Sequence, residues 1–233
     1  MVLRIEPVVG IGEVEPGHDL AGLLAGALST MHPAPDDVLV VTHKVVSKSE
    51  GAVVELPDDG PDAHRPLVER ESMRVVRRRG DLVIAETRHG FICANAGVDR
   101  SNAVPGTAVL LPDDPDRSAR RIRARLGKAL GVRPAVIISD TFGRPWRRGL
   151  VDVAIGVAGM APIHDLRGST DVFGRVLDVT EVNVADEAAA AADLVMGKAT
   201  GICAVLIRGM NPVLGRGSIR EDVVRPAQED LFR

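Results

Sequence analysis

The chain has 233 residues, of which 45% are hydrophobic and 26% charged, and its formal net charge is −3. A chain of this length forms one large domain or two small ones and can bury a core without disulfides or metals. Only 2% of the residues are aromatic. Neither base stacking nor a basic field therefore favours a nucleic-acid ligand.

The two cysteines, Cys93 and Cys203, exclude a zinc knuckle, an iron–sulfur cluster and a disulfide framework. Both lie beside apolar residues and are predicted to be buried, reduced thiols. No apolar run is long enough to cross a bilayer, and the N-terminus lacks the apolar centre of a signal peptide. We therefore expect a cytoplasmic protein without a membrane partner.

Helical and strand patterns follow one another without strict alternation, which predicts an α+β, or mixed α/β, fold. We expect one domain over residues 1–233, with two subdomains as the alternative. Leu56–Pro66 is rich in proline and aspartate and is a linker or a surface loop. In chain order, the predicted elements are helix Leu20–Leu28, strands Val38–Val41 and Ala52–Val54, helix Arg65–Arg78, strands Leu82–Ala85 and Ala108–Leu111, a helix opened by Asp114 and Pro115 and stopped by Gly131, strand Ala135–Ile138, helix Asp186–Met196, and strand Ala204–Ile207.

Familiar signatures of nucleotide and hydrolase sites are absent from the sequence. There is no P-loop, no His-Glu-x-x-His and no Gly-x-Ser-x-Gly. Gly10-Ile11-Gly12 begins like a dinucleotide fingerprint, but Glu15 stands where the third glycine is needed. Any nucleotide must therefore be held by a different frame.

The segment from Ile137 to Gly149 is the strongest candidate for chemistry. A buried strand leads into Asp140, and the carboxyl end of such a strand faces the crevice where α/β sheets hold ligands. Asp140 and Thr141 offer adjacent oxygen ligands that suit Mg²⁺ or Mn²⁺. The arginines at 144, 147 and 148 follow, as phosphoryl transfer requires. The alternative is an Asp-Thr turn with an exposed basic loop.

Two further segments add polar groups next to predicted strands. Asp99 and Asn102 lie in a run of small residues and form either a second metal arm with a nucleotide contact or a simple polar turn. Lys44 and Lys48 flank Ser47 just past a strand and could bind a phosphate or carboxylate. A lone histidine, His43, is more often structural than catalytic. Residues 10–14 form a turn that could approach a nucleotide through its backbone.

Together these segments resemble the coenzyme F420-0:L-glutamate ligase family. The resemblance covers almost the whole chain, and the Asp-Thr-x-Gly-Arg-x-Trp-Arg stretch from Asp140 to Arg147 is its most specific part. The matching segments are residues 9–14, 42–48, 96–102, 139–149, 194–198 and 205–209.

The resemblance implies that L-glutamate is joined to the lactyl-phospho side chain of F420-0, with further glutamates added through γ-linkages. GTP is the co-substrate, two Mg²⁺ or Mn²⁺ ions are expected per site, and K⁺ remains an optional addition. The expected route is an acyl phosphate that the amino group of glutamate attacks. By resemblance, the metal ligands are Asp99, Asp140 and Thr141; the GTP contacts are Ile11, Gly12, Glu13, Val14, His43, Lys48 and Asn102; and the catalytic charges are Lys48, Arg144 and Arg147.

Two positions depart from the family pattern. His43 stands where many members have serine. Lys198 stands where some archaeal members have a residue able to ligate a metal, and a protonated lysine has no lone pair to offer. If that ligand is needed, it comes from elsewhere, or the second metal is bound by fewer protein groups.

The resemblance also implies an unusual α+β fold assembled as an intertwined homodimer. Actinobacterial members carry a C-terminal flavin-binding, nitroreductase-like domain, so the chain is either a stand-alone ligase or an excised N-terminal domain. Two other functions remain open from the residues alone. They are a non-catalytic metal- and nucleotide-binding regulatory module, and another metal-dependent phosphotransferase acting on a small anionic metabolite. The crowding of ligands and arginines at 140–148 favours catalysis.

Overall fold

The core of the protein is a five-stranded sheet with the strand order β1-β12-β2-β8-β9. The structure, a computed structural model, describes residues 2–230. Strands β2 and β8 are parallel, and the other neighbours are antiparallel. The central strands are apolar over nearly their whole length because both faces of the sheet are covered. The strands are β1 (Arg4–Pro7), β2 (Val38–Thr42), β8 (Ala135–Arg144), β9 (Arg147–Ala158) and β12 (Ala204–Arg208).

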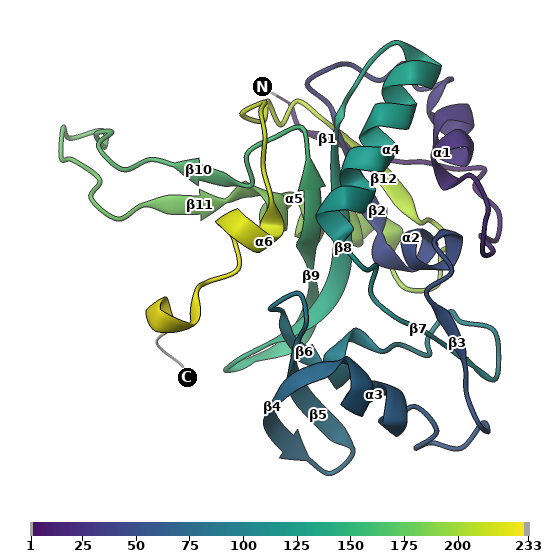
Figure 1. Cartoon of the computed structure of the whole chain (residues 1–233). Coiled ribbons are helices and arrows are strands. Elements are labelled where there is room, and N and C mark those ends of the chain that lie inside the picture. The colour runs from purple at the N-terminus through teal and green to yellow at the C-terminus, as the bar shows by residue number, and fades with distance from the viewer. Residues whose placement is uncertain (1, 231–233) are drawn as a thin grey trace.

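Helices pack on both faces of this sheet. In Figure 1, α4 crosses in front of the sheet with α1 beside it, and α5 lies behind. The Asp114 carboxylate caps α4 by accepting from Arg117 N at 2.8 Å, and Gly131 ends the helix with φ 73°. Asn183 caps α5 in the same way. The helices are α1 (Leu20–Leu28), α4 (Pro115–Leu130) and α5 (Val184–Met196).

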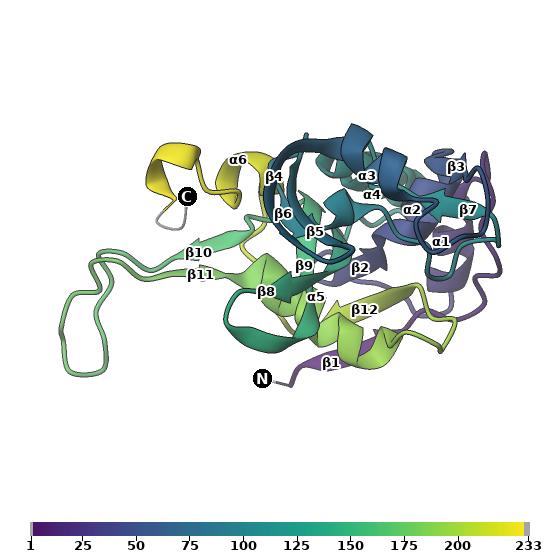
Figure 2. The same ribbon diagram turned by 90° about the horizontal axis from the view of Figure 1, so that it is seen from below.

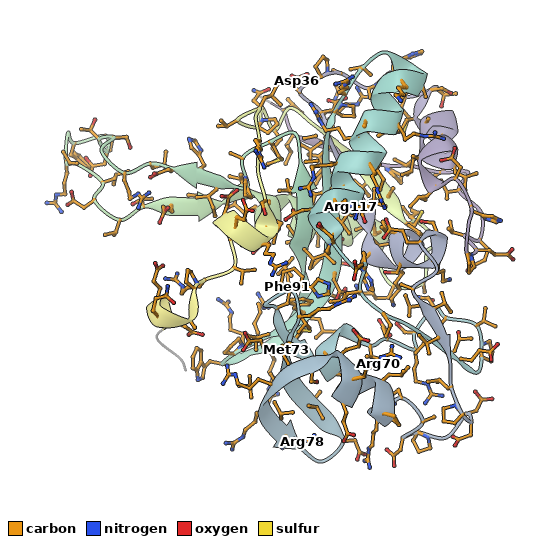
Figure 3. The ribbon with its side chains drawn as sticks, viewed as in Figure 1. Asp36, Arg70, Met73, Arg78, Phe91 and Arg117 are labelled. Carbon is orange, nitrogen blue, oxygen red and sulfur yellow. The ribbon has the colours of Figure 1, made fainter. Side chains whose placement is uncertain are left out.

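A small lobe, residues 53–109, lies below the main sheet in Figure 1 and has its own apolar cluster. Phe91 lies in the turn before β6. Its side chain packs edge-on against Phe142 of β8 in the main sheet, with ring centroids 6.1 Å apart. Figure 3 shows Phe91 between the small lobe and the main sheet. The elements are β3 (Val53–Glu55), α3 (Arg65–Glu71), β4 (Ser72–Arg79), β5 (Leu82–Thr87), β6 (Ile92–Ala94), the 3-10 turn Asn95–Gly97 and β7 (Thr107–Val109).

A hairpin arm projects from the body in both views (Figures 1 and 2). Its base is the antiparallel pair β10 (Ile163–Asp165) and β11 (Glu181–Asn183). The loop at its far end carries apolar side chains that are almost fully exposed, Phe173 at 92%. An apolar surface of this kind on an extended arm is typical of a site that another surface covers.

The C-terminal segment is tied to the body through Asp116. This buried carboxylate accepts hydrogen bonds from Val157 N (2.8 Å), Ile219 N (3.0 Å), Ser218 Oγ (2.7 Å) and Arg220 N (3.3 Å). It therefore joins α4, β9 and the start of α6 at one point. The segment contains α6 (Ile219–Asp222) and a 3-10 turn (Ala227–Glu229).

The predicted mixed α/β class is confirmed, and Cys93 and Cys203 are buried free thiols. The prediction of one helix over Arg65–Arg78 is wrong. The helix ends at Glu71, and the chain continues as β4, because this arginine- and valine-rich stretch pairs with β5. Strands β1, β4, β6, β9, β10 and β11 were not predicted. No helix within residues 2–230 is long and apolar enough to cross a membrane.

Candidate functional site

A cavity of about 980 Å³ lies beyond the ends of the parallel strands β2 and β8. Its volume is at the upper end of the range for small-molecule sites, so it can hold a large substrate or more than one. Segments far apart in the sequence line it. Nine of the predicted site residues do so: Ile11, Gly12, Glu13, Val14, Lys48, Asp99, Asn102, Asp140 and Thr141.

Asp140 occupies the edge of the sheet where parallel pairing stops. The last paired residues of β2 and β8 are Thr42 and Ser139, so Asp140 is the first residue of β8 beyond that ladder. Its strand continues as far as Arg144 in a hairpin with β9. The prediction that the strand ends near Ile138 is therefore wrong. The predicted crevice beside Asp140 is nevertheless present, where the parallel pairing of β2 and β8 stops.

Helix α2 (His43–Ser49) begins directly after β2 and places His43 at this edge. The His43 side chain is 1% exposed, and its Nε2 lies 3.1 Å from Asp140 Oδ1, off the line of a hydrogen bond. Asp140 Oδ1 also accepts from Thr141 N at 2.7 Å. His43 thus lies beneath Asp140 and not on the cavity wall, so we assign it no nucleotide contact.

The lysines on the cavity wall are each paired with carboxylates. Lys48 contacts Glu13, and Lys44 Nζ lies 2.8 Å from Asp99 Oδ2. The sequence offered Lys48 no acidic neighbour except Glu50, so its partner 35 residues away was unforeseen. The third pair joins Lys198 to Asp152 and Asp193.

Asp140 differs from the other carboxylates of the wall, which are Glu13, Asp99, Asp152 and Asp193. Each of those four has an ammonium partner, whereas within residues 2–230 the charge partner of Asp140 is the buried imidazole of His43. A cation can therefore bind to Asp140 without displacing a lysine from a carboxylate of the wall.

Asp99 is held in a tight polar turn. Its Oδ1 accepts from Ser101 N at 2.7 Å, while Oδ2 faces Lys44. Burial alone would raise the pKa of Asp99, but the Lys44 ammonium and the Ser101 donors together hold that pKa below its ordinary value. Asp99 is consequently an anion at neutral pH. Its carboxylate can bind a metal ion while it also contacts the Lys44 ammonium group.

Asp152 is a site residue that the sequence did not reveal. It pairs with Thr141 across the β8–β9 hairpin and is almost fully buried. It accepts from Thr141 Oγ1 at 2.5 Å and from Ser139 Oγ at 2.9 Å. The glycines at 143 and 149 were a signal for this hairpin, because a turn there places residues 141 and 152 opposite each other.

Arg144 and Arg147 do not line the cavity. They pair with each other at the exposed tip of the β8–β9 hairpin, beside Trp146, which is 82% exposed. At about 3.3 Å per residue, this tip is roughly 10 Å along the strand from Thr141. The fixed positive charge on the cavity wall comes from Lys44, Lys48 and Lys198 instead of these arginines.

The donors at this site suit a hard cation that is completed by substrate oxygens. Within residues 2–230, no group of three or more His, Cys, Asp and Glu side chains is arranged to hold a metal ion. Mg²⁺, however, is usually bound through one or two carboxylates, water and substrate phosphates. Asp140, Asp99 and the Thr141 hydroxyl fit that requirement.

The cysteines take no part in such a site. Burial, together with the charge of Asp140, raises the pKa of Cys93 to about 12, and burial raises that of Cys203 to about 11. Both are neutral thiols at physiological pH, and a thiol is a poor metal ligand until it loses its proton.

The sequence of this chain is similar to known proteins of one family. The family model F420-0:Gamma-glutamyl ligase matches residues 9–209. The chain is 45% identical to the coenzyme F420:L-glutamate ligase of Methanopyrus kandleri, over 99% of this chain and 98% of that protein. It is 44% identical to the protein of the same name from Methanothermobacter thermautotrophicus, over the full length of both. With the Methanocaldococcus jannaschii ligase it shares 41% identity over 88% of each chain.

The fold and the charged cavity are thus those of an enzyme of the ligase class. This chain belongs to the F420-0:gamma-glutamyl ligase family, and the matched region contains every residue of the cavity wall.

Proposed function

We propose that this enzyme joins L-glutamate to coenzyme F420-0 with consumption of GTP, and that it adds further glutamates through γ-linkages. The observation that carries the proposal is the similarity, over almost the full length, to proteins named coenzyme F420:L-glutamate ligase. The cavity is consistent with it, because its wall offers both carboxylates for a cation and ammonium groups for anions.

The reaction needs an activated carboxyl group, since oxide would be the leaving group of a free carboxylate. In the proposed first step, a carboxylate oxygen of F420-0 attacks the γ-phosphorus of GTP and GDP leaves. In the second, the amino nitrogen of glutamate attacks the acyl carbon, the bond to phosphate breaks, and the nitrogen gives up a proton. The products are an amide, GDP and phosphate.

Lys48 and Lys44 supply the charge that lets two anions meet in the first step. Lys48 is nearly buried, whereas its partner Glu13 is 69% exposed and can turn into water. Phosphate oxygens that enter the cavity therefore compete with Glu13 for the Lys48 ammonium at little cost. Arg144 and Arg147 would meet whatever part of the substrate extends out of the cavity.

A divalent ion is part of this proposal. Asp140 would hold it, with Asp99 and the Thr141 hydroxyl as further oxygen donors. Bound Mg²⁺ or Mn²⁺ would neutralise and orient the phosphate oxygens. His43, below Asp140, limits the movement of that carboxylate.

We also propose that the enzyme acts as a homodimer. The projecting arm supports this, because Phe173 and its apolar neighbours at the arm's far end are exposed in the single chain. Side chains of this kind are normally buried against another surface. A second copy of the chain is the partner that the family resemblance implies.

The test is an incubation of the enzyme with GTP, glutamate and Mg²⁺ or Mn²⁺, with and without F420-0. We expect phosphate release that requires F420-0 and a product heavier by one or more glutamates. Phosphate release without glutamylation would indicate a different phosphotransferase. GTP binding without any turnover under both metals would refute the proposed catalysis.

A further inference from the structure

Lys198 lies in an unusual environment for a lysine that begins a loop. It follows α5 directly after Gly197, and its ammonium group is surrounded by oxygens from three different elements. Nζ donates a hydrogen bond to the Thr141 hydroxyl of β8. It lies 3.3 Å from Asp152 Oδ1 of β9 and 3.2 Å from Asp193 Oδ1 of α5.

These three oxygens form a donor set for a cation. Two are carboxylate oxygens and one is a hydroxyl, which are the hard donors that divalent ions also use. Asp152 is only 4% exposed, and a buried carboxylate without a counter-charge is strongly unfavourable. Some cation must therefore lie next to Asp152 in the folded protein, and Lys198 supplies it.

Two carboxylates are the counter-charges of this ammonium group, since Nζ lies within 3.3 Å of an oxygen of both Asp152 and Asp193. The side chain is thus a fixed positive charge, and it has no lone pair with which to share the position with a metal ion.

We infer that Lys198 is a resident cation of the candidate active site, which occupies the position between Thr141, Asp152 and Asp193 that a divalent ion would otherwise take. The chain then binds one fewer divalent ion than the donor oxygens of its cavity would allow. The remaining ion belongs at Asp140, the carboxylate without an ammonium partner. The role of this ammonium in phosphoryl transfer rests on the proposed function, but its occupancy of the position does not.

The test counts Mn²⁺ ions bound per chain, by titration with electron paramagnetic resonance of the free ion. It compares the wild type with Lys198→Gln and Lys198→Ala, each without nucleotide and with GTP in the absence of F420-0. The control is Lys128→Gln, which removes a positive charge from an exposed position on α4. Either variant leaves the buried Asp152 without its ammonium partner, so its melting temperature is measured before and after Mn²⁺ is added and should rise when Mn²⁺ binds.

We expect both Lys198 variants to bind one more Mn²⁺ per chain than the wild type, and the Lys128→Gln control to match the wild type. Equal numbers for all four proteins, with and without GTP, would overturn the inference. If the wild type glutamylates F420-0 and the numbers are equal, only the inference is wrong. If the numbers differ but no glutamylation occurs, only the proposed function is wrong.

Discussion

Replacement of Lys48 by methionine tests whether its ammonium group binds substrate. Methionine keeps the apolar stem and the volume but removes the charge. Among the described residues this ammonium has one carboxylate partner, Glu13, which is largely exposed to solvent. Loss of such a partly exposed pair costs less than about 1 kcal/mol of unfolding free energy. We therefore expect Lys48→Met to fold normally.

The kinetic effect should be much larger than the effect on stability. A hydrogen bond from a charged donor contributes about 1.5–3 kcal/mol, which corresponds to roughly 10- to 150-fold in binding. Lys48→Met should raise the KM for GTP, or for F420-0, by that factor. The measurement is the initial rate of phosphate release, first with GTP varied and then with F420-0 varied, at saturating levels of the other substrates.

Glu13→Gln is the matched control because it removes the partner and leaves the ammonium group. It should leave both KM values within about twofold of wild type, or lower them, since substrate no longer competes with Glu13. If Lys48→Met folds and both of its KM values stay within about twofold of wild type, the ammonium group serves only its pair with Glu13. The assignment of Lys48 to the substrate site would then be wrong.

Three further predictions concern the metal position, the tail and the arm. Asp140→Asn should abolish phosphate release and keep the melting temperature, because it removes a charge at constant shape; near-normal activity across Mn²⁺ concentrations would reject the metal role. Asp116→Ala should lower the unfolding free energy by about 3–5 kcal/mol in urea, because four donors lose a buried charged acceptor; a loss below about 1 kcal/mol would contradict this account. Light scattering should give about twice the chain mass of 24.7 kDa for the wild type and a smaller mass for Phe173→Ser. A monomeric wild type with full activity and a melting temperature independent of concentration would refute the dimer.

Local signals in the sequence predicted the helices well where caps were present. Asp114, Pro115 and Gly131 predicted both ends of α4, because cap chemistry involves only neighbouring residues. The same reasoning failed at Arg65–Arg78. There the chain leaves the helix at Ser72 to pair with β5, and strand pairing depends on a distant partner instead of on local periodicity.

The same distinction explains which parts of the site were predicted. Asp140 and Thr141 follow the fully buried part of β8, so their place at the edge of the parallel pair could be inferred. Asp152 looks like an ordinary acidic residue until the β8–β9 hairpin places it opposite Thr141. The Lys48–Glu13 contact joins segments 35 residues apart, and no pattern in either segment indicates it.

The balance of charge on the cavity wall gives a physical reason for the proposed metal ion. The wall carries the carboxylates of Glu13, Asp99, Asp140, Asp152 and Asp193 against the ammonium groups of Lys44, Lys48 and Lys198, an excess of two negative charges. The proposed substrates, GTP and F420-0, are anions, and a cavity with an excess of negative charge repels anions until a cation is added. One divalent ion at Asp140 cancels the excess. With that ion in place, Lys44 and Lys48 are free to exchange their carboxylate partners for phosphate oxygens. The same count supports the inference that one divalent ion binds beside Lys198, since a second would replace an ammonium group that already balances Asp152.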